Sequence, residues 1–408
     1  MSISRGRISH TLGDDFVSLK RAIFGTLQDE KTIVEFEKNF AKYVDREYCH
    51  AYPFARTALY FTLLQLNLPQ KSVVLMPSIM IKAFIDVVLD LGLTPEFVDS
   101  DIESGFANLE HLETKLKEKP SVYVMTYLFG IVPNLSAVKD LLSKYPTFVI
   151  EDFSQCLNGE YNDIRVGKIG NVALYSSSAV KTVDTYGGGM LFHDSKELSK
   201  YHADQIQKLK NPSRFFLFSK ILNSLIKNLA TRRLVFSLFT FPFLRLVQKL
   251  GSDKFDRFVG NRSNSPIKSL PSEWFQRYTS VQAKLGIRRL SKVKEMDKSR
   301  IKIGETFSKL GLNFPSLKSE KPATSVYWQY IVYPQDFKRF QRHLARNGID
   351  CSQSSLINLS NLENYGWSNE SFTAKGLYEQ AVYIPCYPDL SEKELSKISA
   401  ALGDYKEL

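Results

Sequence analysis

Apolar positions in the first half of the chain alternate between strand-like runs and helix-like stripes. Short apolar runs at residues 73–76, 95–98, 122–125 and 148–150 are typical of buried strands. The stretches between them, 79–91, 109–117 and 135–144, carry apolar residues at helical spacing. Residues 33–66 fit two helices around a turn. This rhythm predicts an α/β fold, with a largely parallel sheet covered by helices on both faces.

The pattern changes after about residue 270. We expect a long helix over 272–310 with a break near Gly286, a strand within 325–333 and a helix over 336–346. A strand at 381–384 and a final helix over 391–402 complete a smaller α/β unit. The chain is therefore expected to form a large domain (1–209), a helical insertion (210–265) and a small C-terminal domain (266–408).

Composition is that of a globular protein in a reducing compartment. The chain is 43% hydrophobic and 24% charged, and its four cysteines are far apart with no C-x-x-C pair, which argues against a disulfide framework or a zinc site. The N-terminus has no apolar segment of a secretory signal, so a cytoplasmic location is expected. The net charge of +11 is concentrated between residues 210 and 262, which hold eleven Lys or Arg and two Asp.

The strongest candidate chemistry is at Lys181. This lysine follows a strand-like run and several serines, and it precedes three consecutive glycines at 187–189. Upstream, the strand at 148–150 leads directly into Glu151 and Asp152, and in parallel sheets ligands bind beyond the carboxyl ends of the strands. A lysine that loses its proton and an acid that keeps its charge are the two groups that a pyridoxal 5'-phosphate (PLP) enzyme needs.

Several motifs together resemble the DegT/DnrJ/EryC1/StrS family of PLP-dependent, mostly sugar-modifying aminotransferases. The resemblance rests on the glutamate-rich helix at 34–44, the phosphate-loop-like residues 54–59, the acidic motif at 151–155, the spacing of Met190 nine residues after Lys181, and the segment 382–391. It implies fold type I, like aspartate aminotransferase, with a mostly parallel seven-stranded sheet. It also implies PLP as cofactor and a homodimer with active sites at the interface.

The resemblance assigns a role to each candidate residue. Lys181 would bind PLP and shuttle a proton, and Asp152 would pair with the pyridinium nitrogen. Gln155 would face the cofactor ring or its phenolic oxygen, although a buried structural amide fits nearly as well. The phosphate would be held by the start of the helix at Ala55, Arg56 and Thr57 together with Ser176. A surface arginine and an ordinary strand serine are the alternatives for Arg56 and Ser176.

The chain departs from the family pattern at three places. Ile81, flanked by Met80 and Phe84, stands where the family has an aromatic residue stacked on the cofactor ring. Of the motif that reaches the neighbouring subunit's phosphate, only Arg277 is retained. Tyr186 and Gly187 replace a glycine and an acid. These departures leave the transamination chemistry in place, but they weaken the argument for the family's usual sugar substrates.

The basic insertion contains an amphipathic helix and an uncharged run at 234–244. We expect one helical face to carry seven apolar residues: Phe215, Phe218, Ile221, Leu222, Leu225, Ile226 and Leu229. The uncharged run is too short to span a bilayer, which takes roughly 20 apolar residues. An apolar face beside basic residues favours an anionic membrane surface, and a helical hairpin packed on the body or in a dimer interface is the alternative. Nucleic-acid binding is disfavoured because the apolar residues cluster into one face.

These features predict a homodimeric PLP-dependent aminotransferase. The amino donor would be glutamate, and the acceptor a ketone or aldehyde of a sugar or sugar-like, membrane-proximal or lipid-linked intermediate. Two alternatives stay open. A lyase or dehydratase of the same fold is disfavoured by Lys181, because that branch of the family carries histidine there. A membrane-associated, non-catalytic homologue would explain the departures at Ile81, Phe275 and Gly187.

Overall fold

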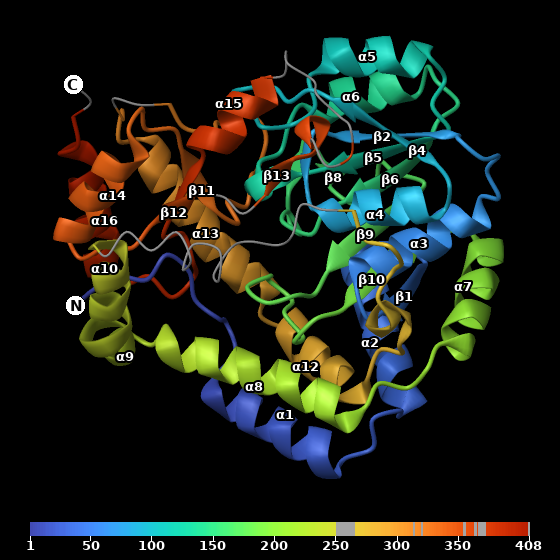
Figure 1. The fold of residues 1–408 in the computed structure, drawn as a ribbon, viewed down its shortest axis with the longest axis horizontal. Helices are drawn as coiled ribbons and strands as arrows, with labels where there is room; N and C mark the ends of the chain where they lie inside the picture. Colours follow the sequence, from blue (N-terminus) through green and yellow to red (C-terminus); the bar gives the residue numbers. More distant parts are fainter. Residues whose placement is uncertain are drawn as a thin grey trace.

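A seven-stranded sheet forms the centre of the larger domain (Figure 1). The computed structural model describes residues 1–249, 266–312, 315–319, 321–353, 356–362, 365 and 373–406. The sheet has the order β1-β10-β9-β6-β5-β2-β4. Its strands are β1 (Tyr48–Tyr52), β2 (Val73–Pro77), β4 (Thr94–Val98), β5 (Val122–Thr126), β6 (Phe148–Asp152), β9 (Val172–Ser176) and β10 (Gly189–His193). All neighbours from β9 to β4 are parallel, and β10 is antiparallel to β9 and β1. The predicted fold class is confirmed.

Helices cover both faces of this sheet because successive strand residues point to opposite sides. In β2, Leu75 packs into one core while Val74 and Met76 pack into the other. The first core also takes side chains from α2 (Glu30–Val44), α5 (Leu109–Lys117), α6 (Leu135–Leu142) and α12 (Ser280–Leu290). The second core takes side chains from α3 (Ala55–Gln65), α4 (Lys82–Asp90) and α7 (Lys196–Lys208).

A smaller unit is built on a three-stranded antiparallel sheet. Its strands are β11 (Tyr330–Val332), β14 (Val382–Ile384) and β12 (Ser352–Gln353). Its core includes side chains from α13 (Val293–Ser308), α14 (Phe337–Arg346) and α16 (Glu392–Gly403). Ile3 also belongs to this core, and its N–H donates to the carbonyl oxygen of Gly348 over 2.8 Å. The start of the chain therefore crosses over to pack on residues near its end.

Two local predictions were wrong. Residues 33–66 contain strand β1 between their two helices, where only a turn was expected. The expected helix over 272–310 is divided into a short 3-10 turn (Ser272–Phe275), α12 and α13, and it breaks at Ser291–Lys292 rather than at Gly286. Gly286 lies inside α12, at a position where a Cβ atom would come within 2.4 Å of the Phe36 ring. The glycine lets α12 pack closely on α2, and it does not end the helix.

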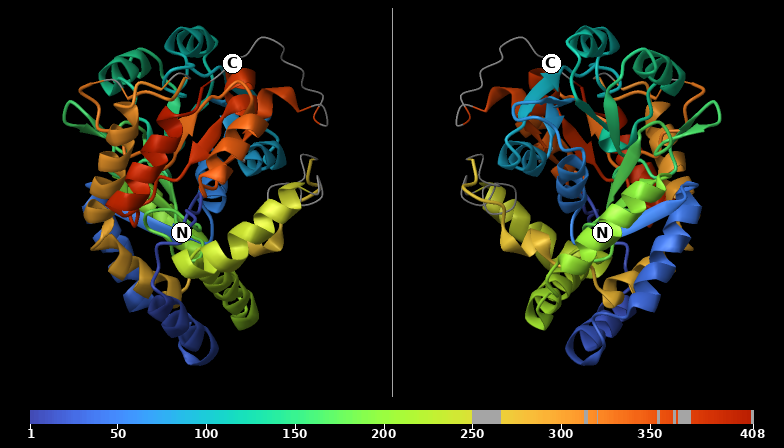
Figure 2. Two further views of the ribbon diagram at one scale, coloured as in Figure 1. Left: turned by 90° about the vertical axis from the view of Figure 1, so that its left-hand side faces the viewer. Right: turned by 90° about the vertical axis from the view of Figure 1, so that its right-hand side faces the viewer.

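The insertion forms α8 (Arg214–Ala230), the short α9 (Arg233–Val235), a π-helical turn (Phe236–Thr240) and α10 (Phe241–Lys249). Helix α8 packs beside α1 (Leu12–Phe24) at the lower edge of the molecule in Figures 1 and 2. Residues 250–265 of the expected insertion lie outside the described residues. No helix in the described part of the chain is both long and apolar enough to cross a membrane.

The expected apolar face of α8 was only partly right. The buried residues are Leu217, Ile221, Ser224, Leu225 and Asn228, whereas Phe215 and Ile226 are 78% and 55% exposed. The contact stripe includes Asn228 because the N-terminal residues opposite α8 carry polar groups, to which its side-chain amide donates. The hydroxyl of Ser224 is buried in the same stripe without a hydrogen-bond partner among the described residues. Much of the apolar surface of the insertion is therefore left facing outward.

Candidate active site

Lys181 lies in the loop between β9 and β10, and its side chain is almost completely buried. Its Nζ atom is 3.8 Å from the centre of the Trp328 ring. Burial lowers the pKa of this amine to about 7; the carboxylate of Asp152 opposes the shift and the guanidinium of Arg300 adds to it. A neutral amine, which is what a nucleophilic lysine needs, is thus available close to neutral pH.

Asp152 is the last residue of β6, in the middle of the sheet, and its carboxylate is buried. The N–H of Ser154 donates to Oδ1 over 3.0 Å. Burial raises the pKa of Asp152, while hydrogen bonds from Ser154 and the charge of Lys181 pull it down. Within the described residues this carboxylate has no ion-pair partner within 4 Å. It therefore fits a ligand that brings a protonated ring nitrogen.

The neighbouring acid, Glu151, has a different environment. Its carboxylate accepts hydrogen bonds from the hydroxyl of Tyr127 (2.7 Å) and from the N–H groups of Gly167, Ile169 and Gly170 (2.6, 2.8 and 2.9 Å). Successive strand residues face opposite sides of the sheet, so Glu151 and Asp152 point in opposite directions. Glu151 joins two loops within the protein, whereas Asp152 occupies the end of the strand.

Ser176 is linked to Asp152 through Ser154, and Gln155 follows Asp152 by three residues in the chain. Ser176 ends β9, its N–H donates to the hydroxyl of Ser154 (2.8 Å), and its own hydroxyl donates to that of Ser178 (3.1 Å). The side-chain oxygen of Gln155 accepts the N–H of Phe129 at 2.5 Å. One end of the Gln155 amide is thus held by the backbone, as the alternative role of a structural amide predicts.

The predicted phosphate loop is the start of α3. This helix begins at Ala55 with no side-chain cap, and the glycine run lies directly against it: a Cβ atom on Gly189 would come within 2.1 Å of the Ala55 nitrogen. The guanidinium of Arg56 stacks on the rings of Phe54 and Trp274, 4.7 and 4.5 Å from their centres. The buried hydroxyl of Thr57 donates to the carbonyl oxygen of Trp274 (2.7 Å), so this proton is not available for a hydrogen bond to a phosphate.

Lys220 of α8 lies at this same place, which the sequence did not predict. Its Nζ atom is 4.3 Å and 4.4 Å from the ring centres of Phe54 and Phe216, and it is next to Gly187, whose Cβ position lies 3.4 Å away. Burial lowers the pKa of Lys220 to about 8; nearby Arg56 lowers it further and Glu273 opposes the shift. The spacing of Phe216 and Lys220, which lie four residues apart on one helix, is the only feature of the local sequence that points to this contact.

The remaining expected residues have the following places. Ile81 is partly buried and directly precedes α4, close to the end of β2. Arg277 forms an ion pair with Glu30 of its own chain, and its N–H donates to the carbonyl oxygen of Lys210. Trp328, which covers Lys181, comes from the segment before β11 and was missed, because nothing local relates positions 181 and 328.

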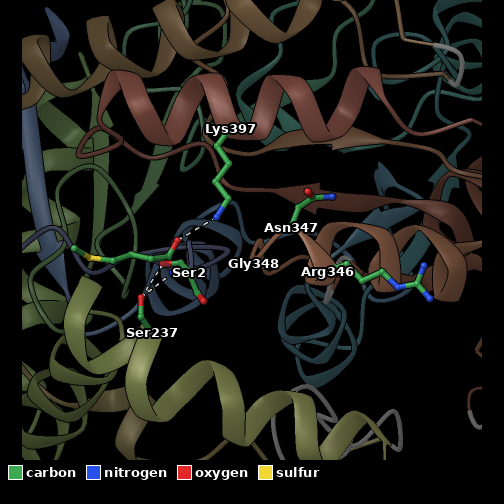
Figure 3. A pocket seen from close by; sticks show the side chains of 7 residues that line it. Ser2, Ser237, Arg346, Asn347, Gly348 and Lys397 are labelled. Atoms are coloured by element: carbon green, nitrogen blue, oxygen red, sulfur yellow. Dashed lines mark hydrogen bonds between the residues drawn. The ribbon is translucent and has the colours of Figure 1, made fainter.

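A cavity of about 490 Å³ lies elsewhere, where the N-terminus, the insertion and the small domain meet (Figure 3). The N–H of Ser2 donates to the hydroxyl of Ser237 (2.8 Å), and Lys397 donates to the carbonyl oxygen of Met1 (3.3 Å). None of the predicted site residues lines this cavity, so it is not the site of the proposed chemistry. In the described part of the chain, no group of three or more His, Cys, Asp or Glu residues is arranged to hold a metal ion.

This chain resembles known proteins in sequence and in fold. Residues 20–214 and 245–403 match the DegT/DnrJ/EryC1/StrS aminotransferase family. An uncharacterised protein of Methanocaldococcus jannaschii is 22% identical, over 90% of this chain and 88% of that protein. GDP-perosamine synthase of Escherichia coli O157:H7 is 28% identical, over 41% of this chain and 46% of the synthase. UDP-4-amino-4-deoxy-L-arabinose–oxoglutarate aminotransferase of Shewanella sediminis is 27% identical, over 43% and 44% of the two chains.

The fold is also shared with solved structures. The aminotransferase PseC of Helicobacter pylori, involved in the biosynthesis of pseudoaminic acid, superposes with a TM-score of 0.73 over 98% of both chains at 16% identity. The family match extends over most of the sequence and includes Lys181 and Asp152. This chain therefore belongs to the DegT/DnrJ/EryC1/StrS aminotransferase family, and it is a PLP-dependent transaminase of fold type I.

Proposed function

We propose that this transaminase moves an amino group from glutamate to the carbonyl group of a sugar or sugar-like acceptor. The observation that carries the proposal is the buried amine of Lys181, with a pKa of about 7, close enough to Asp152 at the end of β6 for the two charges to interact. The names of two relatives support a sugar acceptor, and one of them names oxoglutarate, the keto acid that glutamate becomes.

We propose these residue roles. Lys181 binds PLP through its amine, and the buried carboxylate of Asp152 keeps the ring nitrogen protonated. The phosphate is held by the α3 amides at Ala55 and Arg56, by the Arg56 guanidinium, by Ser176 and by the ammonium of Lys220. Thr57 contributes only its backbone, Ile81 packs on the ring, and Gln155 lies at its edge.

PLP supplies an electron-withdrawing ring that stabilises negative charge on a substrate carbon. Lys181 removes the proton from the α-carbon of the amino donor and, in the second half-reaction, returns a proton to the acceptor carbon. Its low pKa serves both steps, because the same amine has to accept and release a proton near neutral pH. Trp328 covers the amine and keeps bulk water from it.

The test is spectroscopic. Purified protein incubated with PLP should show a visible band that borohydride abolishes, L-glutamate should convert that band, and keto sugars should restore it. Lys181→Ala should lack the band and the activity. The absence of a band in the wild-type protein would contradict the assignment of Lys181. Elimination of the substrate's amino or hydroxyl group, in place of its exchange, would favour the lyase alternative.

We also propose that the outward apolar surface of α9, the π-helical turn and α10 lies on an anionic membrane. Leu234, Leu238, Phe239, Phe243 and Leu246 are 55–69% exposed there. The uncharged run that holds most of them is flanked by Arg233 and Arg245. Such contact would bring the enzyme close to a lipid-linked acceptor or pathway partner.

Co-sedimentation with phosphatidylglycerol vesicles tests the membrane proposal. Leu238→Asp/Phe239→Asp should abolish binding, whereas Ile102→Asp, at an equally exposed apolar position on the large domain, should not. If wild-type protein does not sediment and the double variant instead dissociates an oligomer, this surface is an interface between copies of the chain.

We further propose that the enzyme is a homodimer with active sites at the interface, as the family resemblance implies. Light scattering on the purified protein measures the mass. If Arg277 reaches the neighbour's site, mixing inactive Lys181→Ala with Arg277→Ala should restore part of the activity, since one site of each mixed dimer then has both residues. No restoration would place Arg277 in a purely intrachain role, as its ion pair with Glu30 suggests.

A further inference from the structure

The residue before Lys181 has an unfavourable backbone conformation. Val180 has φ +65°, a left-handed conformation that β-branched residues rarely adopt. Two contacts hold it: its N–H donates to Oδ2 of Asp184 (3.0 Å), and its carbonyl oxygen accepts the indole N–H of Trp328 (3.1 Å). The position of the Lys181 backbone therefore depends on what fixes Asp184.

Asp184 is completely buried and belongs to a chain of polar groups. Its Oδ1 accepts the N–H of Tyr186 (2.9 Å), and its Oδ2 lies 3.2 Å from Nε2 of His10. The other ring nitrogen of His10 lies 3.2 Å from Oδ1 of Asp15. Because both ring nitrogens face carboxylates, the ring is held as an imidazolium. Burial by itself would lower the pKa of His10, but the two carboxylates raise it to about 9.

Asp15 is held in turn by the inserted helix. The side-chain amide of Asn228, on α8, donates to Oδ2 of Asp15 (2.7 Å) and to the carbonyl oxygen of His10 (3.0 Å). The hydroxyl of Tyr186 donates to Oδ1 of Asp15 (2.9 Å). His10, Asp15, Asp184 and Asn228 are all buried, so few alternative partners are available to them. The charge of Arg289, whose guanidinium also donates to the carbonyl oxygen of Thr182 (3.3 Å), acts on Asp184 from the side of α12.

The origin of these residues sets the arrangement apart from the family pattern. His10, Asp15 and Asn228 come from residues 1–19 and 215–244, which lie outside the match to the family. Tyr186 stands where the family resemblance calls for glycine, and it has a left-handed backbone with φ +62°. A tyrosine is stabilised there because its hydroxyl reaches Asp15 and its ring packs edge-on against His10, with the centroids 4.7 Å apart. Two segments outside the family match thus meet at the loop that carries Lys181.

We infer that His10, Asp15 and Asn228 are positioning residues for Lys181, so that the inserted helix α8 forms part of the support of the reactive lysine. They act through Asp184 and the backbone of Val180 and do not touch the reacting atoms. This inference rests on the proposed role of Lys181. It gives α8 a function inside the enzyme, independent of any surface that the insertion presents outside.

The experiment measures the loop directly, by hydrogen exchange of the Val180 amide in the full-length chain with and without PLP. Asn228→Ala removes the two hydrogen bonds that α8 donates to Asp15 and to the carbonyl oxygen of His10. Tyr186→Phe removes only one hydroxyl, so it keeps the test available if the first variant does not fold. Ser224→Ala is the matched control, one turn earlier on the same buried face, since the Ser224 hydroxyl has no partner among the described residues. We expect exchange at Val180 to be about tenfold faster in Asn228→Ala and measurably faster in Tyr186→Phe, and unchanged in Ser224→Ala.

A second readout is the pH dependence of the rate at which Lys181 reacts with added PLP, followed by absorbance. Loosening the loop admits water to the amine, so the pH midpoint should move up from about 7 in Asn228→Ala and stay in place in Ser224→Ala. Folded Asn228→Ala and Tyr186→Phe proteins with wild-type exchange and midpoint would overturn the inference, as would an equal effect of Ser224→Ala. If no PLP band forms even in wild-type protein, the proposed function fails, and the exchange measurement still decides whether α8 holds the loop.

Discussion

The side chain of Trp328 contacts both Lys181 and the residue that precedes this lysine, Val180. The ring centre lies 3.8 Å from the Lys181 amine, and the indole N–H donates to the carbonyl oxygen of Val180. The tryptophan comes from the segment that enters the small domain, whereas the lysine belongs to the large one. The two parts of the molecule therefore enclose the reactive amine together.

Replacing Trp328 should raise the pKa of Lys181. In Trp328→Leu the amine gains water, and its pKa should move from about 7 toward 10.5. The ring's attraction for the charged amine is lost as well, which works in the opposite direction. That attraction is worth only about 0.5–2 kcal/mol. The effect of burial is larger, because each unit of pKa shift corresponds to roughly 1.4 kcal/mol and burial lowers the pKa of Lys181 by several units. The pH dependence of PLP attachment measures the change, and Trp328→Phe, which keeps an aromatic ring, should shift it far less.

The adjacent acids Asp152 and Glu151 should separate catalysis from stability. Asp152→Asn should fold and take up PLP but lose at least about a hundredfold in turnover, because the carboxylate that keeps the ring nitrogen protonated is gone and the ring then withdraws electrons less strongly. Glu151→Gln should lower the free energy of unfolding by ~2 kcal/mol or more, since an amide cannot satisfy four donors that face a carboxylate. Single-turnover kinetics and urea unfolding distinguish the two variants. A stability loss in both, with turnover intact, would rule out the role given to Asp152.

Lys220 should contribute to binding of the cofactor phosphate. Lys220→Met is expected to weaken PLP about tenfold while leaving the affinity for pyridoxal, which lacks the phosphate, nearly unchanged. Lys227→Met removes an exposed lysine from the same helix and serves as the control. Equal losses of PLP and pyridoxal affinity in Lys220→Met would mean that the lysine acts on the fold of the site and not on the phosphate.

Three neighbouring buried histidines should make the protein sensitive to mild acid. His50, His193 and His202 lie with ring centroids 5.3–5.9 Å apart, and burial lowers their pKa values to about 3, 4 and 2. Between pH 6.5 and about 4 they bind protons only in the unfolded chain. Stability should therefore fall as the pH decreases through this window, by at most about 1.4 kcal/mol per pH unit for each histidine.

Urea unfolding at a series of pH values tests this expectation. His193→Phe keeps an aromatic ring in the cluster and should make the pH dependence of stability less steep. Tyr48→Phe alters a ring stacked on His193 without changing the histidines, so it should keep the wild-type slope. An unchanged slope in His193→Phe would assign the acid sensitivity to other groups.

The sequence by itself determined the features that local patterns encode. Alternating strand and helix periodicities predicted the parallel part of the sheet, and a carboxylate directly after an apolar strand predicted Asp152 at a strand end. Lys181 stood out for a similar reason, since small residues and glycines surround it in the chain. The motifs that identify the family are likewise short and contiguous, so they can be read without the fold.

Only the tertiary structure decided which distant residues surround those groups. Trp328, Lys220 and the His10–Asp15–Asn228 cluster reach the Lys181 loop and the start of α3 from positions tens to more than a hundred residues away in the sequence. The buried face of α8 was misjudged for the same reason: helical periodicity ranks residues by hydrophobicity, whereas this interface buries Asn228 against polar partners on another segment. A buried polar group is stable only beside its partner, and that partner is defined by the fold and not by the neighbouring sequence.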